Sequence, residues 1–161
     1  MRTETRAMTN GTTRRWVKWL IVTLVVAVMA FSASPNGPLG TFWRPSPEVP
    51  HPAGVQLPLL VLLNLAEVVT FGLGVSFLIF GYPLVQSTLP ASKGLTLAAY
   101  LSIGWLLANW WPHDSLHVAN GLRLNGLIEI EYGCHIPLMG AGAILAYFFV
   151  TLLRQQARQS R

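Results

Sequence analysis

Four long runs of apolar residues set the strongest limit on what this sequence can fold into. They cover residues 16–33, 57–82, 94–111 and 126–153, and polar or proline-rich segments separate them. A transmembrane helix needs roughly 20 mostly apolar residues to cross a bilayer. Only 11% of the residues are charged, less than half of the roughly 25% that is usual in soluble domains. We therefore expect an all-α integral membrane protein, a four-transmembrane-helix bundle.

The first apolar run, residues 16–33, permits a second interpretation. Basic residues precede it and the small residues of Ala30-Phe31-Ser32 close it, a pattern that is also typical of a cleavable signal peptide. We favour an uncleaved first helix, and both interpretations place the following loop outside the membrane. That loop, residues 34–56, contains six prolines and three glycines. Because proline blocks helix formation, we expect an extracytoplasmic Pro-rich loop here.

The basic residues predict which side of the membrane each end occupies. Nine of the eleven Lys and Arg residues lie in the N-terminal segment up to Lys18, in the turn at 83–93, or in the C-terminal tail. Cytoplasmic segments carry an excess of Lys and Arg, so we expect both termini to be cytoplasmic. The expected protein is multi-pass and belongs to a plasma membrane or a bacterial inner membrane.

This division gives three parts: a flexible cytoplasmic tail at 1–15, a single transmembrane domain at 16–153 and a basic cytoplasmic tail at 154–161. The principal partner is then the lipid bilayer. No basic stripe continues into the body of the chain, so nucleic-acid binding is excluded as an interpretation. The one cysteine, Cys134, cannot form an intrachain disulfide.

Polar side chains concentrate between Asn109 and His135. This stretch holds three of the four histidines, the only aspartate and two of the five glutamates. Each of two pairs, His113 with His117 and Glu131 with His135, is spaced four residues apart, which places its members on one face of a helix. Imidazole and carboxylate groups are typical ligands of transition metals. The candidate metal ligands are His113, His117, Glu131, His135 and Glu67. Asp114 is a candidate acceptor for the N–H of a ligating imidazole, which would orient the ring.

Glu67 joins this set because of its expected depth. At about 1.5 Å per residue, Glu67 in the second run and His135 in the fourth lie roughly 15 and 13 Å below the outer interface. A carboxylate at such depth costs at least about 2.5 kcal/mol unless it has a partner. We therefore expect Glu67 to face the bundle interior near His135. The short connection at 118–125 is expected to fold His113 and His117 over the mouth of the bundle.

The pattern leaves the metal, and the function itself, open. A mixed nitrogen and oxygen set suits zinc, iron, copper or manganese. Alternatively, His113 and His117 anchor the chain at the headgroup level beside Trp110 and Trp111, and the remaining pair is structural. No catalytic residue is assigned, and whether the protein is an enzyme stays undecided.

Three functions agree with these observations. The first is a metal-binding membrane protein whose site opens to the outside. The second is a non-enzymatic small subunit, or assembly partner, of a homo-oligomer or larger membrane complex. The third is a proton- or ion-coupled carrier that uses Glu67 and His135 as a relay.

Overall fold

The computed structural model describes residues 2–35, 37–39, 46–47, 54–89 and 92–159, and of residues 2–13 it describes the backbone alone. The regular structure within these ranges is helical, without a strand. The elements in chain order are α1 (Arg2–Ala33), α2 (Gln56–Phe80), α3 (Tyr82–Thr88), α4 (Lys93–Ala108), α5 (Trp110–Asn120), α6 (Leu124–Ile130), a π-helical turn (Glu131–His135) and α7 (Ile136–Gln159).

Three helical segments are long and apolar enough to cross a membrane. They are Arg14–Ala33, Gln56–Phe80 and Leu124–Arg158. The segment expected as the third span, α4, is apolar but only 16 residues long. The expected all-α fold is therefore confirmed, and these three helices indicate a membrane protein. Helix α1 begins at Arg2, well before residue 16, because no proline precedes Pro35 to stop it.

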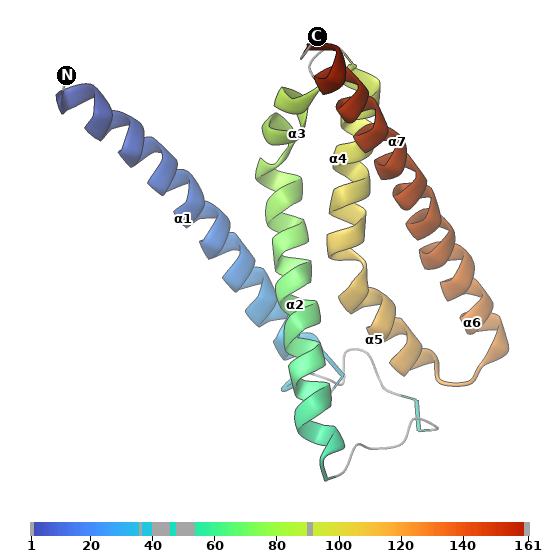
Figure 1. Ribbon diagram of the computed structural model, residues 1–161. Coiled ribbons are helices and arrows are strands. Elements are labelled where there is room, and N and C mark those ends of the chain that lie inside the picture. The colour runs from blue at the N-terminus through green and yellow to red at the C-terminus, as the bar shows by residue number, and fades with distance from the viewer. Residues whose placement is uncertain (1, 36, 40–45, 48–53, 90–91, 160–161) are drawn as a thin grey trace.

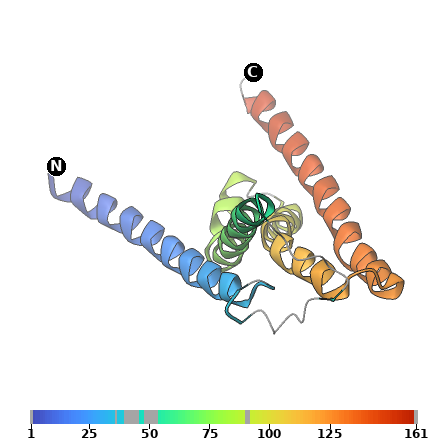
Figure 2. The ribbon, with the colours of Figure 1, turned by 90° about the horizontal axis from the view of Figure 1, so that it is seen from below.

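The four long helices α1, α2, α4 and α7 alternate in direction. Both termini therefore lie at one end of the molecule (Figure 1). Helices α5 and α6 and the turn between them form the opposite end, at which α1 ends and α2 begins; residues 34–55 are the connection between these two helices. The amide of Ser46 in that connection donates a hydrogen bond to the carbonyl of Val118 in α5. Seen from below, α1 and α7 lean away from the central helices α2 and α4 in different directions (Figure 2).

Glycines allow α2 to approach two neighbours closely. A Cβ added to Gly72 would lie 2.4 Å from the carbonyl oxygen of Thr23 in α1, and one added to Gly74 would lie 2.7 Å from the amide nitrogen of Ala108 in α4. The hydroxyls of Thr23 and Ser76, 2.8 Å apart, add a buried hydrogen bond between α1 and α2. Close packing through small residues is common between helices in lipid.

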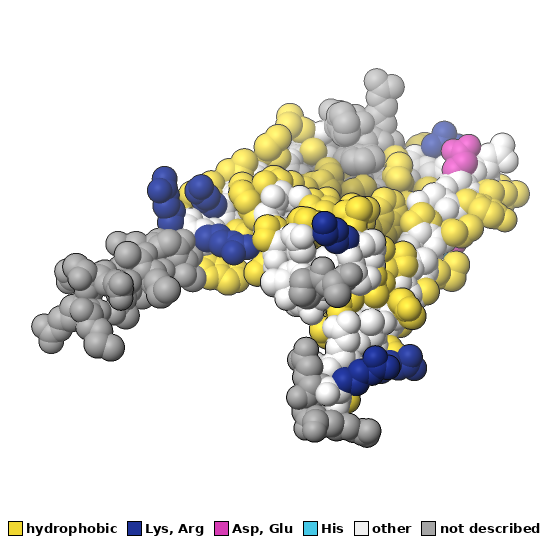
Figure 3. All heavy atoms as spheres, turned by 90° about the horizontal axis from the view of Figure 1, so that it is seen from above, with side chains coloured by type: hydrophobic (Ala, Val, Ile, Leu, Met, Phe, Trp, Pro, Cys, Tyr) yellow, Lys and Arg dark blue, Asp and Glu magenta, His cyan; other side chains and the backbone are white. Residues whose placement is uncertain are grey.

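A compact apolar cluster joins α3, α4 and α7 near the end that carries the termini. Its buried members are Val85, Leu89, Ala99 and Phe148. Lys and Arg side chains stand on this end of the molecule, above a largely hydrophobic surface (Figure 3). This distribution agrees with the bias in charge that the sequence shows.

The segment after α4 differs from the expectation. Pro112, directly after the third apolar run, predicts the end of a helix and a loop at 113–125, but the chain is interrupted earlier, at Asn109, and then continues as α5. Pro112 lies in the first turn of α5, where a missing N–H costs little because those amides have no intrahelical partner. The connection to α6 is therefore only residues 121–123.

Candidate functional site

A tight turn between α5 and α6 positions the two halves of the site. Asn120 is buried, and its side-chain amide donates to the carbonyls of Gly121 and Arg123 at 3.3 and 3.0 Å. Gly121 has φ 60°, a conformation that disfavours larger residues. The guanidinium of Arg123 donates in turn to the carbonyls of Ala119 and Asn120, which end α5. These contacts hold α5 beside α6 and the π turn.

His113 and His117 form the first pair of the site. Both lie on one face of α5, and their Nε2 atoms are 3.1 Å apart. The rings meet edge to face with centroids 4.6 Å apart. A hydrogen bond between two imidazole nitrogens requires one ring to donate and the other to accept, so at least one of the two rings is neutral when it forms.

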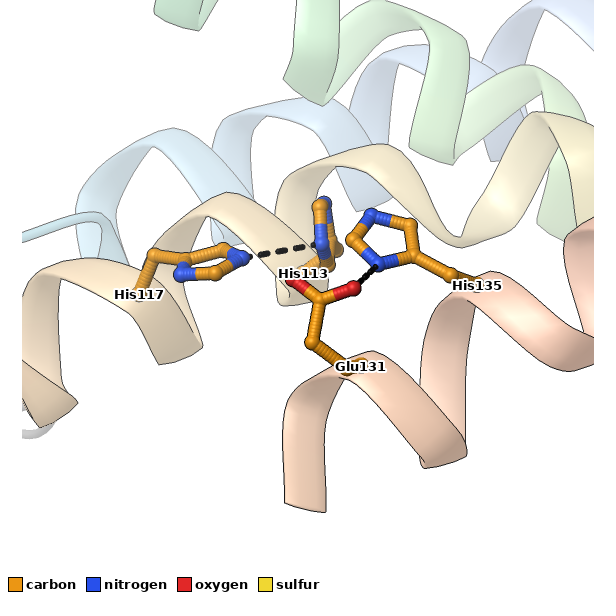
Figure 4. A network of polar contacts seen from close by, with 4 residues as sticks. All are labelled: His113, His117, Glu131 and His135. Carbon is orange, nitrogen blue, oxygen red and sulfur yellow. Dashed lines mark hydrogen bonds and ion pairs between the residues drawn. The ribbon is translucent and has the colours of Figure 1, made fainter. Parts of the chain in front are cut away.

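Glu131 and His135 form the second pair, within the π turn. Nδ1 of His135 lies 2.5 Å from Oε2 of Glu131 (Figure 4). The side chains are 36% and 56% exposed for His135 and Glu131, respectively, so the pair lies at the surface of the molecule. The i→i+5 bonding of a π-helix widens the turn. Pro137 gives a reason for it, since it has no N–H to donate to the carbonyl of Gly133, four residues earlier.

The two pairs meet across the α5–π-turn contact. The rings of His113 and His135 lie edge to face with centroids 4.8 Å apart. Figure 4 shows the carboxyl of Glu131 directed toward the three rings. The structure therefore brings His113, His117, Glu131 and His135 into one cluster, built from two helices.

The cluster is not a preformed metal centre. Among the described residues, no group of three or more His, Cys, Asp or Glu side chains is arranged to hold a metal ion. Instead, the nitrogen and oxygen donors are paired with each other, His113 with His117 and His135 with Glu131.

Glu67 and Asp114 lie apart from these pairs. Glu67 is half-buried on α2, a helix that packs against α1, α4 and α5. Its charged neighbour is Asp114 on α5, and no hydrogen bond or ion pair between described residues joins Glu67 to His135. Asp114 is exposed and acts electrostatically on His113 without a hydrogen bond to a described imidazole. The structure therefore does not show the expected pairing of Glu67 with His135, and the charged side chain near Glu67 comes from α5, which packs against α2.

The surroundings of His113 favour its neutral form. Helix α5 lies outside the three candidate membrane spans. Burial lowers the pKa of His113 below its ordinary value of 6.5, and the neighbouring His117 and His135 lower it further. The carboxylates of Asp114 and Glu131 oppose this shift without reversing it. A neutral ring has a free lone pair, which ligation of a metal requires.

Ser34 supports the site and was missed in the sequence. Its buried hydroxyl lies 2.9 Å from both the Ala30 carbonyl and the Asn64 side-chain oxygen. It also accepts the indole N–H of Trp111 at 2.9 Å. One hydroxyl thus links α1, α2 and α5. A serine at the end of an apolar run gives no signal for such a role, whereas Gly133 followed by Pro137 could have indicated a disturbed helix.

Comparisons with known proteins leave the function to be argued from this geometry. No family model matches the sequence, and neither curated proteins nor solved structures gave a match.

Proposed function

We propose that this protein is a four-span membrane protein that binds one transition metal ion at the cluster of His113, His117, Glu131 and His135. The observation that carries the proposal is the 3.1 Å between the Nε2 atoms of His113 and His117. Two imidazole nitrogens at about 2.0–2.1 Å from a tetrahedral ion lie roughly 3.3 Å apart. The pair on α5 is therefore already spaced as two ligands of one ion would be.

The second pair supplies the further donors. The ring of His135 lies next to that of His113, and the carboxyl of Glu131 is half exposed and directed toward it. A carboxylate bonded to one nitrogen of an imidazole orients the ring and increases its basicity, an arrangement frequent around metal ligands. Binding then requires loss of the proton that His113 and His117 share and rotation of side chains in both pairs.

The proposed location of the cluster is the extracytoplasmic surface. From His135 to Arg154 the helix rises roughly 28 Å at about 1.5 Å per residue, close to the roughly 30 Å of a hydrocarbon core. With the basic residues of both termini at the cytoplasmic surface, His135 lies near the opposite surface, shallower than the sequence suggested. The same orientation makes α4 the fourth crossing segment and leaves α5 at the extracytoplasmic surface.

Metal titration of the detergent-purified protein tests the proposal. The protein is dialysed against Zn²⁺ or Cu²⁺, with protein-free micelles as the blank, and bound metal is measured by mass spectrometry. We expect one ion per chain, and a loss of affinity of about tenfold or more in both His117→Gln and Glu131→Gln. His51→Gln is the matched control, because it removes the fourth histidine, which lies outside the described residues and is not one of the proposed ligands.

Two results would contradict the proposal: no stoichiometric binding, or equal affinity in His117→Gln and His51→Gln. Either result would favour the structural alternative, in which the protein is a small subunit of a larger membrane complex. A carrier that relays protons from Glu67 to His135 gains no support, because those two side chains are not joined.

A further inference from the structure

A long apolar groove lies on another face of the molecule. It runs between α4 and α5 on one side and the π turn and α7 on the other, and its volume is about 920 Å³. Its lining surface is almost wholly apolar and includes Leu101, Trp105 and Ile144. Small-molecule sites usually measure roughly 300–1,000 Å³. A groove of this size and lining, between apolar helices, suits a hydrocarbon chain.

A second hollow, which carries polar side chains among apolar ones, lies between α5 and α6 and adjoins the groove. This hollow, of about 470 Å³, shares Leu116 and Cys134 with the groove and is lined by Asn120, Arg123 and Glu129. The combined cavity therefore has an apolar body and a charged mouth. None of the three clustered histidines lines either part, so this site is independent of the proposed metal site.

The mouth presents two opposite charges that do not neutralise each other. Among the described residues, the one ion pair within 4 Å is His135 with Glu131, so Arg123 and Glu129 remain separate. Hydrogen bonds to the carbonyls of Ala119 and Asn120 fix the guanidinium of Arg123 without cancelling its charge. Guanidinium groups bind phosphate well, and a carboxylate accepts hydrogen bonds from an ammonium group.

From this charge complementarity we propose that the cavity binds a zwitterionic phospholipid with a primary ammonium group, of the phosphatidylethanolamine type. One acyl chain occupies the groove between α4 and α7. The phosphate meets Arg123 and the ammonium meets Glu129. A lipid with a net negative head group, such as phosphatidylglycerol, has no cation to pair with Glu129. The quaternary ammonium of phosphatidylcholine has no N–H to donate to the Glu129 carboxylate. Both of these lipids should therefore bind more weakly than phosphatidylethanolamine.

Native mass spectrometry of the detergent-purified full chain tests the groove. The protein is titrated with phosphatidylethanolamine, phosphatidylglycerol or phosphatidylcholine of identical acyl chains. Gly140 lines the groove, and a Cβ added to it meets nothing within 4 Å, so we expect the side chain of Gly140→Leu to occupy part of the groove. Each methylene kept out of an apolar site weakens binding roughly fourfold, so we expect a loss of at least about tenfold. Gly142→Leu is the control, because Gly142 is equally open and does not line the groove.

Glu129→Gln tests the mouth. We expect wild-type protein to prefer phosphatidylethanolamine by a few-fold, up to about fivefold for a partly exposed ion pair. The variant should lose this preference and keep its binding of the acyl chain. Equal binding of all three lipids to wild type, Gly140→Leu and Gly142→Leu would mean surrounding bilayer lipid only and would overturn the proposal. A dimer that excludes lipid from the groove would overturn it in favour of a second copy of the chain.

Discussion

Gly126 in α6 gives the most direct test of how α5 is held against the π turn. A Cβ at this position would lie 1.8 Å from Oδ1 of Asn120 and 2.6 Å from its Cγ. Asn120 is buried and bonded to two carbonyls, so it cannot move aside without losing those bonds. Gly126→Ala should therefore loosen the α5–α6 turn.

The expected magnitude follows from the two hydrogen bonds and the helix propensity. Each lost hydrogen bond costs roughly 0.5–1.5 kcal/mol, or about 1–3 kcal/mol for the pair. Replacing a helical glycine with alanine stabilises the helix by roughly 0.5–1 kcal/mol, which offsets part of this loss. The net loss in free energy of unfolding should be about 0–2.5 kcal/mol.

The assay is unfolding in mixed micelles of increasing SDS content, followed by far-ultraviolet circular dichroism. Gly142→Ala is the control, because its added Cβ meets nothing within 4 Å, and it should stabilise by roughly 0.5–1 kcal/mol. In an Asn120→Ala background the clash partner is gone, so Gly126→Ala should become neutral or stabilising. Equal stability of Gly126→Ala and Gly142→Ala in the wild-type background would refute the reasoning.

Three further predictions concern pH, packing and topology. The folded state holds the pKa of His113 below 6.5, so the unfolded chain takes up that proton first; stability should fall as the pH drops below about 6.5, and less so in His113→Gln. Gly72→Ala places a Cβ 2.4 Å from the Thr23 carbonyl oxygen and should destabilise the protein by about 1–3 kcal/mol in the same SDS assay. In a cysteine-free background, an impermeant thiol reagent should label Leu124→Cys but not Gln156→Cys in intact cells; the reverse pattern would invert the topology.

Local spacing predicted the parts of this site that depend on a single helix. His113 with His117, and Glu131 with His135, meet because residues four apart share a helical face. The contacts of Gly72 and Gly74 were likewise visible as small residues in an apolar run.

The remaining features depend on how helices meet, which spacing does not encode. Pro112 is compatible with either the end of a helix or the first turn of the next, and the choice decided whether the histidines lay on a loop or on α5. The expected partner of Glu67 was chosen from its depth in the membrane alone. In the structure the charged neighbour of Glu67 is Asp114, which lies on the helix that follows the break at Asn109. The hydrogen bonds of Ser34 join α1, α2 and α5. They can be predicted only once the relative positions of these three helices are known.

The π turn at Glu131–His135 also sets the rotational phase of everything that follows it. Such a turn contains one residue more than an α-helical turn, and one residue corresponds to about 100° around an α-helix of 3.6 residues per turn. Ala141 and Ile144 of α7 line the groove with this offset from α6 already included. Removing Gly133 would take out the extra residue and rotate these side chains by about a quarter turn relative to Glu129 and the mouth. The one extra residue of the π turn thus determines whether side chains of α6 and of α7 line the same cavity.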